Sequence, residues 1–73
     1  MIEAASARNA AIHFFPAWTI DDERIDGNMT YFLMTKIVGD AVQEKFVTVE
    51  NTPSCPTMYQ VCFATNEVYI GAI

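Results

Sequence analysis

Residues 29 to 50 read MTYFLMTKIVGDAVQEKFVTVE, two runs of mostly β-branched and aromatic residues on either side of GDAVQ. Such residues favour strands, and successive side chains of a strand point to opposite faces. This stretch therefore predicts a β-hairpin with strands at about 29–38 and 45–50. Gly39-Asp40 is not the Asn-Gly or Asp-Gly of a two-residue turn. We expect a longer loop there, and one helical turn over 40–45 is a form it can take.

The flanking segments extend this hairpin into a sheet. Asp26-Gly27-Asn28 predicts a turn leading into the first strand, because glycine and asparagine tolerate positive φ. Residues 51–57, NTPSCPT, predict a loop, since two prolines exclude a central strand. Further strands are expected at 58–64 and 67–72. From the alternation we predict one buried face, made of Tyr31, Leu33, Ile37, Val47, Val49, Val61, Phe63 and Ile70.

The N-terminal segment contains five alanines within residues 2–13, and alanine has the highest intrinsic helix propensity. It predicts a short helix over about residues 3–12. A helix this short with an alanine face is marginal, so a frayed or disordered N-terminus is an alternative. An edge strand from about residue 11 is another, because Pro16 biases Phe15 toward an extended conformation.

Length and composition place the whole chain, residues 1–73, in one small α+β domain with an antiparallel sheet of three to four strands. A hydrophobic content of 52% is too high for a disordered chain. The apolar runs are too short for a transmembrane helix, and the N-terminus lacks the features of a signal peptide. A soluble, cytoplasmic protein, monomeric when free, is the expectation.

The segment 14–28, FFPAWTIDDERIDGN, is the candidate partner-binding site. Aromatic residues stand just before four carboxylates, which with Arg24 supply −3 of the net charge of −5. Aromatics are enriched at interface centres, and charges around them set orientation and association rate. The alternative is that the aromatics are core residues and DDERID is a solvated turn. The predicted contact residues are Phe15, Trp18, Asp21, Asp22, Glu23 and Asp26.

Catalytic and metal-binding patterns are missing from the sequence. Asp21, Asp22 and Glu23 are contiguous, whereas a calcium loop alternates its ligands. Cys55 and Cys62 lack the spacing of a zinc site, and we expect both to stay reduced, with Cys62 a small buried hydrophobe. The single histidine and isolated glycines give no nucleophile set and no phosphate loop. We expect neither enzymatic activity nor a cofactor or metal.

The charge of the chain narrows the class of partner. Only four residues are basic against nine acidic ones, which argues against direct binding to nucleic acid. In length, acidity and lack of catalytic motifs the chain resembles the small phage-encoded proteins that bind host RNA polymerase as transcription inhibitors and antiterminators. The resemblance implies binding to bacterial RNA polymerase, or to another host protein, in the host cytoplasm. It implies inhibited initiation and passage of elongation through terminators. No motif is aligned, so no residue role is carried over.

A nucleic-acid mimic that inhibits a host defence nuclease, of the anti-restriction or anti-CRISPR type, is the alternative function. Such mimics spread carboxylates over a long face, whereas here most of the charge lies in the six residues 21–26.

Overall fold

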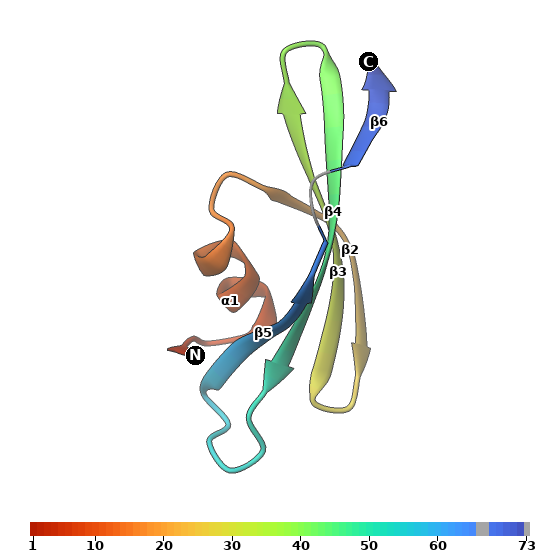
Figure 1. Ribbon diagram of the computed structural model, residues 1–73. Helices are drawn as coiled ribbons and strands as arrows, with labels where there is room; N and C mark the ends of the chain where they lie inside the picture. Colours follow the sequence, from red (N-terminus) through yellow and green to blue (C-terminus); the bar gives the residue numbers. More distant parts are fainter. Residues whose placement is uncertain (66–67, 73) are drawn as a thin grey trace.

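The protein is built around the hairpin of β3 (Met29–Val38) and β4 (Ala41–Asn51), which pair along their full length. The structure, a computed structural model, describes residues 1–65 and 68–72, with side-chain burial for 1–65. Its other elements are β1 (Ile2–Glu3), α1 (Ala7–Phe14), β2 (Thr19–Asp26), β5 (Met58–Ala64) and β6 (Val68–Ala72). The strands form one antiparallel sheet in the order β1-β5-β4-β3-β2, with β6 pairing β4 (Figure 1). The α+β class and the antiparallel sheet agree with the prediction.

Tight glycine turns close both hairpins of the β2-β3-β4 meander. The pairs Val38↔Ala41 and Asp26↔Met29 leave only two residues in each turn. The first turn residue is Gly39 in one and Gly27 in the other, with φ of 65° and 63°. A positive φ at the first central position is the pattern of a type II′ turn, which glycine adopts readily. The turn predicted at 26–28 is confirmed. The longer loop with a helical turn over 40–45 is wrong, because β4 begins at Ala41.

Strand β2 (Thr19–Asp26) was missed by the sequence prediction, which placed no strand at residues 21–26 and gave a solvated turn there only as an alternative. It pairs β3 from Thr19↔Thr35 to Asp26↔Met29, with an irregularity between Ile20 and Asp22. Both faces of this edge strand are largely exposed. Charged side chains are therefore compatible with a strand here, and they are common on sheet edges.

The opposite edge of the sheet is shared by two strands. The last part of β4 pairs β5, and its first part pairs β6. Strand β1 then pairs β5 through Ile2↔Tyr59. The loop predicted at 51–57 lies between β4 and β5, where the Asn51 side-chain amide donates to the Pro56 and Met58 carbonyls at 2.9 and 3.1 Å. The predicted strand 58–64 is confirmed. Residue 67 and the side chain of Ile70 lie outside what the structure describes.

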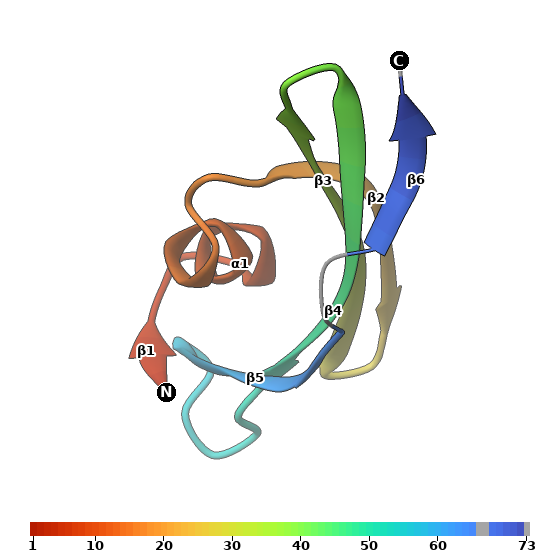
Figure 2. The same cartoon turned by 45° about the horizontal axis from the view of Figure 1, so that its top comes forward.

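Helix α1 covers one face of the sheet (Figure 2). It begins after Ser6, whose side chain accepts a hydrogen bond from the Asn9 amide at 3.1 Å. The helix therefore spans 7–14 rather than the predicted 3–12, and the edge strand from residue 11 does not form. Ala10 and Ala11 are completely buried, so the small alanine side chains let the helix lie close to the sheet. The core beneath it consists of Ala10, Ala11, Trp18, Phe32, Met34, Val47, Val49 and Tyr59.

The buried face of β3 is the opposite of the one predicted. Phe32 and Met34 are buried, whereas Tyr31 and Ile37 are exposed. The register explains this outcome, because Phe32 is paired with Val47 and directly paired residues share a face. Val47 and Val49 are buried as predicted, and Val61 is half-buried. The predictions for Tyr31, Ile37 and Phe63 are wrong, because these side chains are exposed, and Leu33 is half-buried on the face opposite the core.

Candidate functional site

The candidate site is the face of the sheet opposite α1, which no element covers within residues 1–65 and 68–72. We call it the open face. The register places Leu33 beside Phe46 and Tyr31 beside Thr48, with Phe63 on the other side of Thr48. The side chains of these neighbours therefore point the same way from three adjacent strands. The result is a continuous aromatic and aliphatic surface.

The exposed fractions of the aromatic side chains show how far this surface is accessible to solvent. Phe63 is 57% exposed, Phe46 49% and Tyr31 43%. Large aromatics usually bury most of their area in a small domain, and a scattered exposed one needs no explanation. Here three of them lie on neighbouring strands of one face. Grouped exposure of this kind is typical of an interaction surface.

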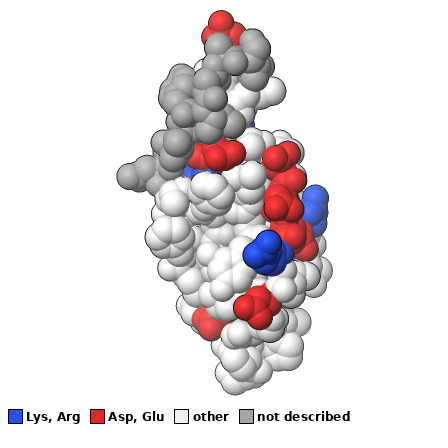
Figure 3. Space-filling model, turned by 90° about the vertical axis from the view of Figure 1, so that its right-hand side faces the viewer, with Lys and Arg blue, Asp and Glu red and all other residues white. Residues whose placement is uncertain are grey.

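Charged residues border the open face along β2 and at the end of β4. On β2, Asp22, Arg24 and Asp26 pair with Leu33, Tyr31 and Met29 and so project to this face. Near the end of β4, Glu50 accepts a hydrogen bond from the Gln60 side-chain amide of β5 at 2.6 Å. Figure 3 views the open face and shows uncharged residues across its middle, with acidic residues gathered along one side. The face is apolar at its centre and mainly acidic at its border.

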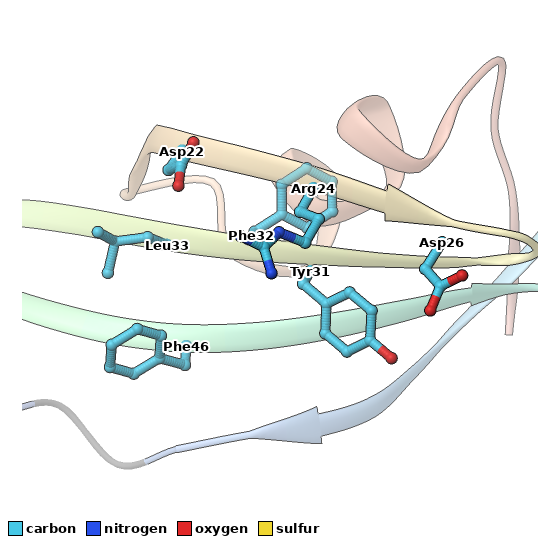
Figure 4. A pocket seen from close by; sticks show the side chains of 7 residues that line it. All are labelled: Asp22, Arg24, Asp26, Tyr31, Phe32, Leu33 and Phe46. Carbon is cyan, nitrogen blue, oxygen red and sulfur yellow. The ribbon is translucent and has the colours of Figure 1, made fainter.

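A hollow of about 450 Å³ lies where the apolar centre meets β2. Figure 4 shows the Tyr31 and Phe46 rings and the Leu33 side chain along it, with the Arg24 guanidinium reaching over from β2. Asp22 and Asp26 stand on either side of Arg24 along the same strand. Its lining residues are Asp22, Arg24, Asp26, Tyr31, Phe32, Leu33 and Phe46. With Arg24 between two carboxylates and the Tyr31 and Phe46 rings beside it, the hollow is suited to binding a side chain that has both an apolar and a polar part.

The residues predicted to bind a partner are divided between the two faces. Trp18 is only 8% exposed and belongs to the core. The Lys36 and Lys45 ammonium groups each lie 4.9 Å from its ring centroid. Phe15 is half-buried against the same core, with the Lys45 ammonium 4.1 Å from its ring. Both aromatics therefore contribute to the packing under α1.

The four predicted carboxylates are all exposed on β2, but they differ in surroundings. Glu23 is on the helix side and accepts a 3.0 Å hydrogen bond from the Arg8 guanidinium. Asp22 accepts a hydrogen bond from the Glu23 backbone amide at 2.9 Å, beside the strand irregularity at Asp21. Asp26 closes the strand at the Gly27 turn. Asp22 and Asp26 share the open face, and their role in partner binding stays a prediction.

The cysteines are both free and exposed, which corrects the prediction that Cys62 is buried. Cys62 lies on β5 with its sulfur 3.9 Å from a Glu50 carboxylate oxygen. Desolvation and the Glu50 charge raise the pKa of the Cys62 thiol. A raised pKa lowers the fraction of reactive thiolate, which is unfavourable for a nucleophile.

The described residues of the open face show no cluster of metal-ligating side chains. No group of three or more His, Cys, Asp or Glu side chains within the described part of the chain is placed to hold a metal ion. The only histidine, His13, is on α1 and packs edge-on against Phe14, on the other side of the sheet. What the arrangement supplies is apolar area, a hollow and a border of charge.

Comparison with protein-family models, with curated proteins and with solved structures finds no match. Among the described residues, no helix is long and apolar enough to cross a membrane.

The sequence prediction missed the aromatics of the open face as site residues, because it assigned Tyr31 and Phe63 to the core and gave Phe46 no role. One signal was present in the sequence. The side chains of Val47 and Val49 point to one face of the strand, and that of Phe46 points to the other. Once the face with the two valines is buried, Phe46 must face outward.

Proposed function

We propose that this protein is a small binding module that holds a protein partner on the open face of its sheet. We further propose that the partner is bacterial RNA polymerase, and that binding inhibits initiation and promotes antitermination. The observation that carries the first proposal is the exposed cluster of Tyr31, Phe46 and Phe63 within an acidic border. The polymerase proposal is supported by the resemblance in length, acidity and lack of catalytic motifs.

The layout of the open face indicates the surface it would meet. Aromatic residues at the centre of an interface supply buried area, and charges at its rim guide the approach of the partner. An apolar centre bordered by Asp22, Asp26 and Glu50 is complementary to an apolar patch surrounded by lysine or arginine. A phosphate backbone is not complementary to it, because like charges repel.

The nucleic-acid mimic is the second candidate. The gathering of acidic residues along one side of the molecule favours it (Figure 3). Arg24 interrupts that row, however, and Arg8 pairs with Glu23 from the helix side. The row also borders an apolar surface, which a nuclease groove built for phosphates does not need.

The test is co-elution of the purified protein with bacterial RNA polymerase, followed by promoter-dependent transcription. We expect a complex, reduced initiation and no gel shift with DNA alone. The variants F46S and F63S should each weaken the complex about tenfold or more, since truncating an aromatic hot spot of an interface costs about 2 kcal/mol or more.

The matched control is I25S. Ile25 is 68% exposed, but it pairs with Thr30 and so lies on the helix side of the sheet. It should leave binding unchanged. Equal losses for I25S and F46S would show that the open face is not the interface, and failure of the wild type to bind polymerase would remove that partner. Binding to a defence nuclease instead, lost in a charge reversal at Asp22 and Asp26, would favour the mimic.

A further inference from the structure

Strand β2 has an outer edge with no partner among the described residues. It is the last strand in the sheet order and pairs only β3. An edge strand carries a row of backbone N–H and C=O groups that can pair with another strand. The opposite edge differs, because β1 covers part of β5 and β6 covers the first part of β4. Thr19–Asp26 is therefore a long strand open to addition.

The charges of β2 determine which kind of strand could pair with its free edge. The strand carries four carboxylates and one arginine. Two copies of β2 brought edge to edge would place like charges together, which disfavours self-pairing. A cationic strand would meet opposite charges instead. The same side chains that protect the edge from self-association therefore favour a basic partner.

The order of side chains on the open face gives a pattern. Asp22, Arg24 and Asp26 occupy alternate positions of β2, so an added strand would present alternate residues to them. Lysine or arginine suits the two aspartates. An aromatic residue suits the middle position, because it can stack on the Arg24 guanidinium. The complementary pattern is basic-x-aromatic-x-basic.

We propose that the free edge of β2 binds an extended basic segment of the partner as an additional strand, with the pattern basic-x-aromatic-x-basic set over Asp22, Arg24 and Asp26. Backbone hydrogen bonds to β2 supply the pairing, and the aromatic side chain stacks on the Arg24 guanidinium. The proposal rests on the proposed function and specifies the segment that the partner contributes.

The probe is the capped peptide Thr-Lys-Val-Phe-Val-Lys-Thr, whose symmetric pattern suits either strand direction. In a titration followed by amide NMR, with peptide up to about 1 mM, we expect shifts centred on β2. Every second amide of β2 should gain protection from hydrogen exchange.

A peptide with glutamate for lysine, and peptides N-methylated at every second residue in either phase, separate charge from backbone pairing. The glutamate peptide should bind at least about tenfold more weakly. One of the two N-methylated peptides should lose binding.

The matched variants carry the same change in net charge. D22K/D26K should weaken binding of the probe about tenfold or more. E3K/D40K, which reverses two carboxylates away from β2, should not. Equal binding of both N-methylated peptides and the parent peptide, shifts elsewhere than β2, or no binding at the highest concentration would each overturn strand addition. Because these measurements need no polymerase, a negative result together with intact co-elution would leave the proposed function standing.

Discussion

Met34 and Leu33 are neighbours in sequence with opposite surroundings. Met34 is completely buried under α1, whereas Leu33 is half-buried on the open face. We expect M34A to lower the free energy of unfolding by about 2–5 kcal/mol, through lost burial and the cavity left behind. L33A should cost clearly less, because solvent already reaches the site. Urea denaturation of both variants measures the difference. A larger loss for L33A would mean that the two faces are assigned the wrong way round.

Trp18 gives a second test at a single residue. Replacing it with alanine removes a large buried ring, and we expect a loss of about 3–5 kcal/mol. Since small domains have only about 5–15 kcal/mol of stability, W18A should be much less stable or unfolded by circular dichroism. W18F, which keeps most of the apolar volume, should stay folded. A stable W18A that loses only partner binding would instead make Trp18 a contact residue.

Cys62 allows a test by pH. Its pKa is raised by desolvation and by the Glu50 carboxylate, so the folded thiol ionises at higher pH than the unfolded one. Any stabilisation from this shift is present below the unfolded pKa and is lost as pH rises through the folded pKa. The alkylation rate of Cys62 by iodoacetamide should therefore reach its midpoint at higher pH in native than in urea-unfolded protein. E50Q should lower the native midpoint, and mass spectrometry distinguishes Cys62 from Cys55. An unchanged midpoint in E50Q would exclude the Glu50 charge as a cause.

Among the elements, the β3–β4 turn depends most clearly on one residue. Gly39 has φ of 65° with open space around its Cα, so a side chain there meets strain from the backbone alone. We expect G39A to cost about 1–2 kcal/mol, the penalty of a left-handed conformation for an L-residue. D-alanine at the same position, introduced by chemical synthesis, should restore the stability. If both enantiomers cost the same, the loss would come from the added methyl group and not from φ.

The elements also show which parts of the fold the sequence could predict. The runs that form β3 and β5 have strong strand composition, and their predicted bounds agree with the structure. Strand β2 was missed because an edge strand exposed on both faces needs no apolar residues. The buried phase of β3 was inverted because both phases carry large apolar or aromatic side chains, Tyr31 and Leu33 on one and Phe32 and Met34 on the other. Only the pairing of Phe32 with Val47 shows which of these two sets of side chains is buried. This register depends on the two-residue turn at Gly39-Asp40.

At the scale of the whole molecule, the candidate site depends on where charge and apolar surface meet. The sequence prediction grouped the carboxylates of 21–26 with Trp18, but the fold places Trp18 in the core and Glu23 on the helix side, apart from Asp22 and Asp26. The aromatics that do accompany Asp22 and Asp26 come from β3 and β4. Neighbours across a sheet are distant in sequence, so composition along the chain could not find this grouping.

The overall charge of −5 gives the last prediction. With a basic partner surface, association should slow as salt rises, because exposed charges act over a Debye length of about 8–10 Å. D21K/D22K should slow association most at low salt and have a smaller effect at high salt, while dissociation changes little. Stopped-flow or surface binding kinetics on the polymerase complex measure both rates. An effect of the double reversal confined to dissociation would place these residues inside the contact rather than at its rim.

The strands β2, β3, β4 and β5 lie in the sheet in the order in which they follow one another in the chain. Closing the short connections between these strands costs little conformational entropy. Pairing β1 with β5 costs more, because most of the sequence separates Ile2 from Tyr59. Local contacts form fastest, so this meander can assemble before the N-terminal segment is added. Without α1, both faces of the sheet would be open to solvent, and Phe32 would be exposed like Phe46. The packing of α1 against the sheet therefore determines which face is buried and which is exposed.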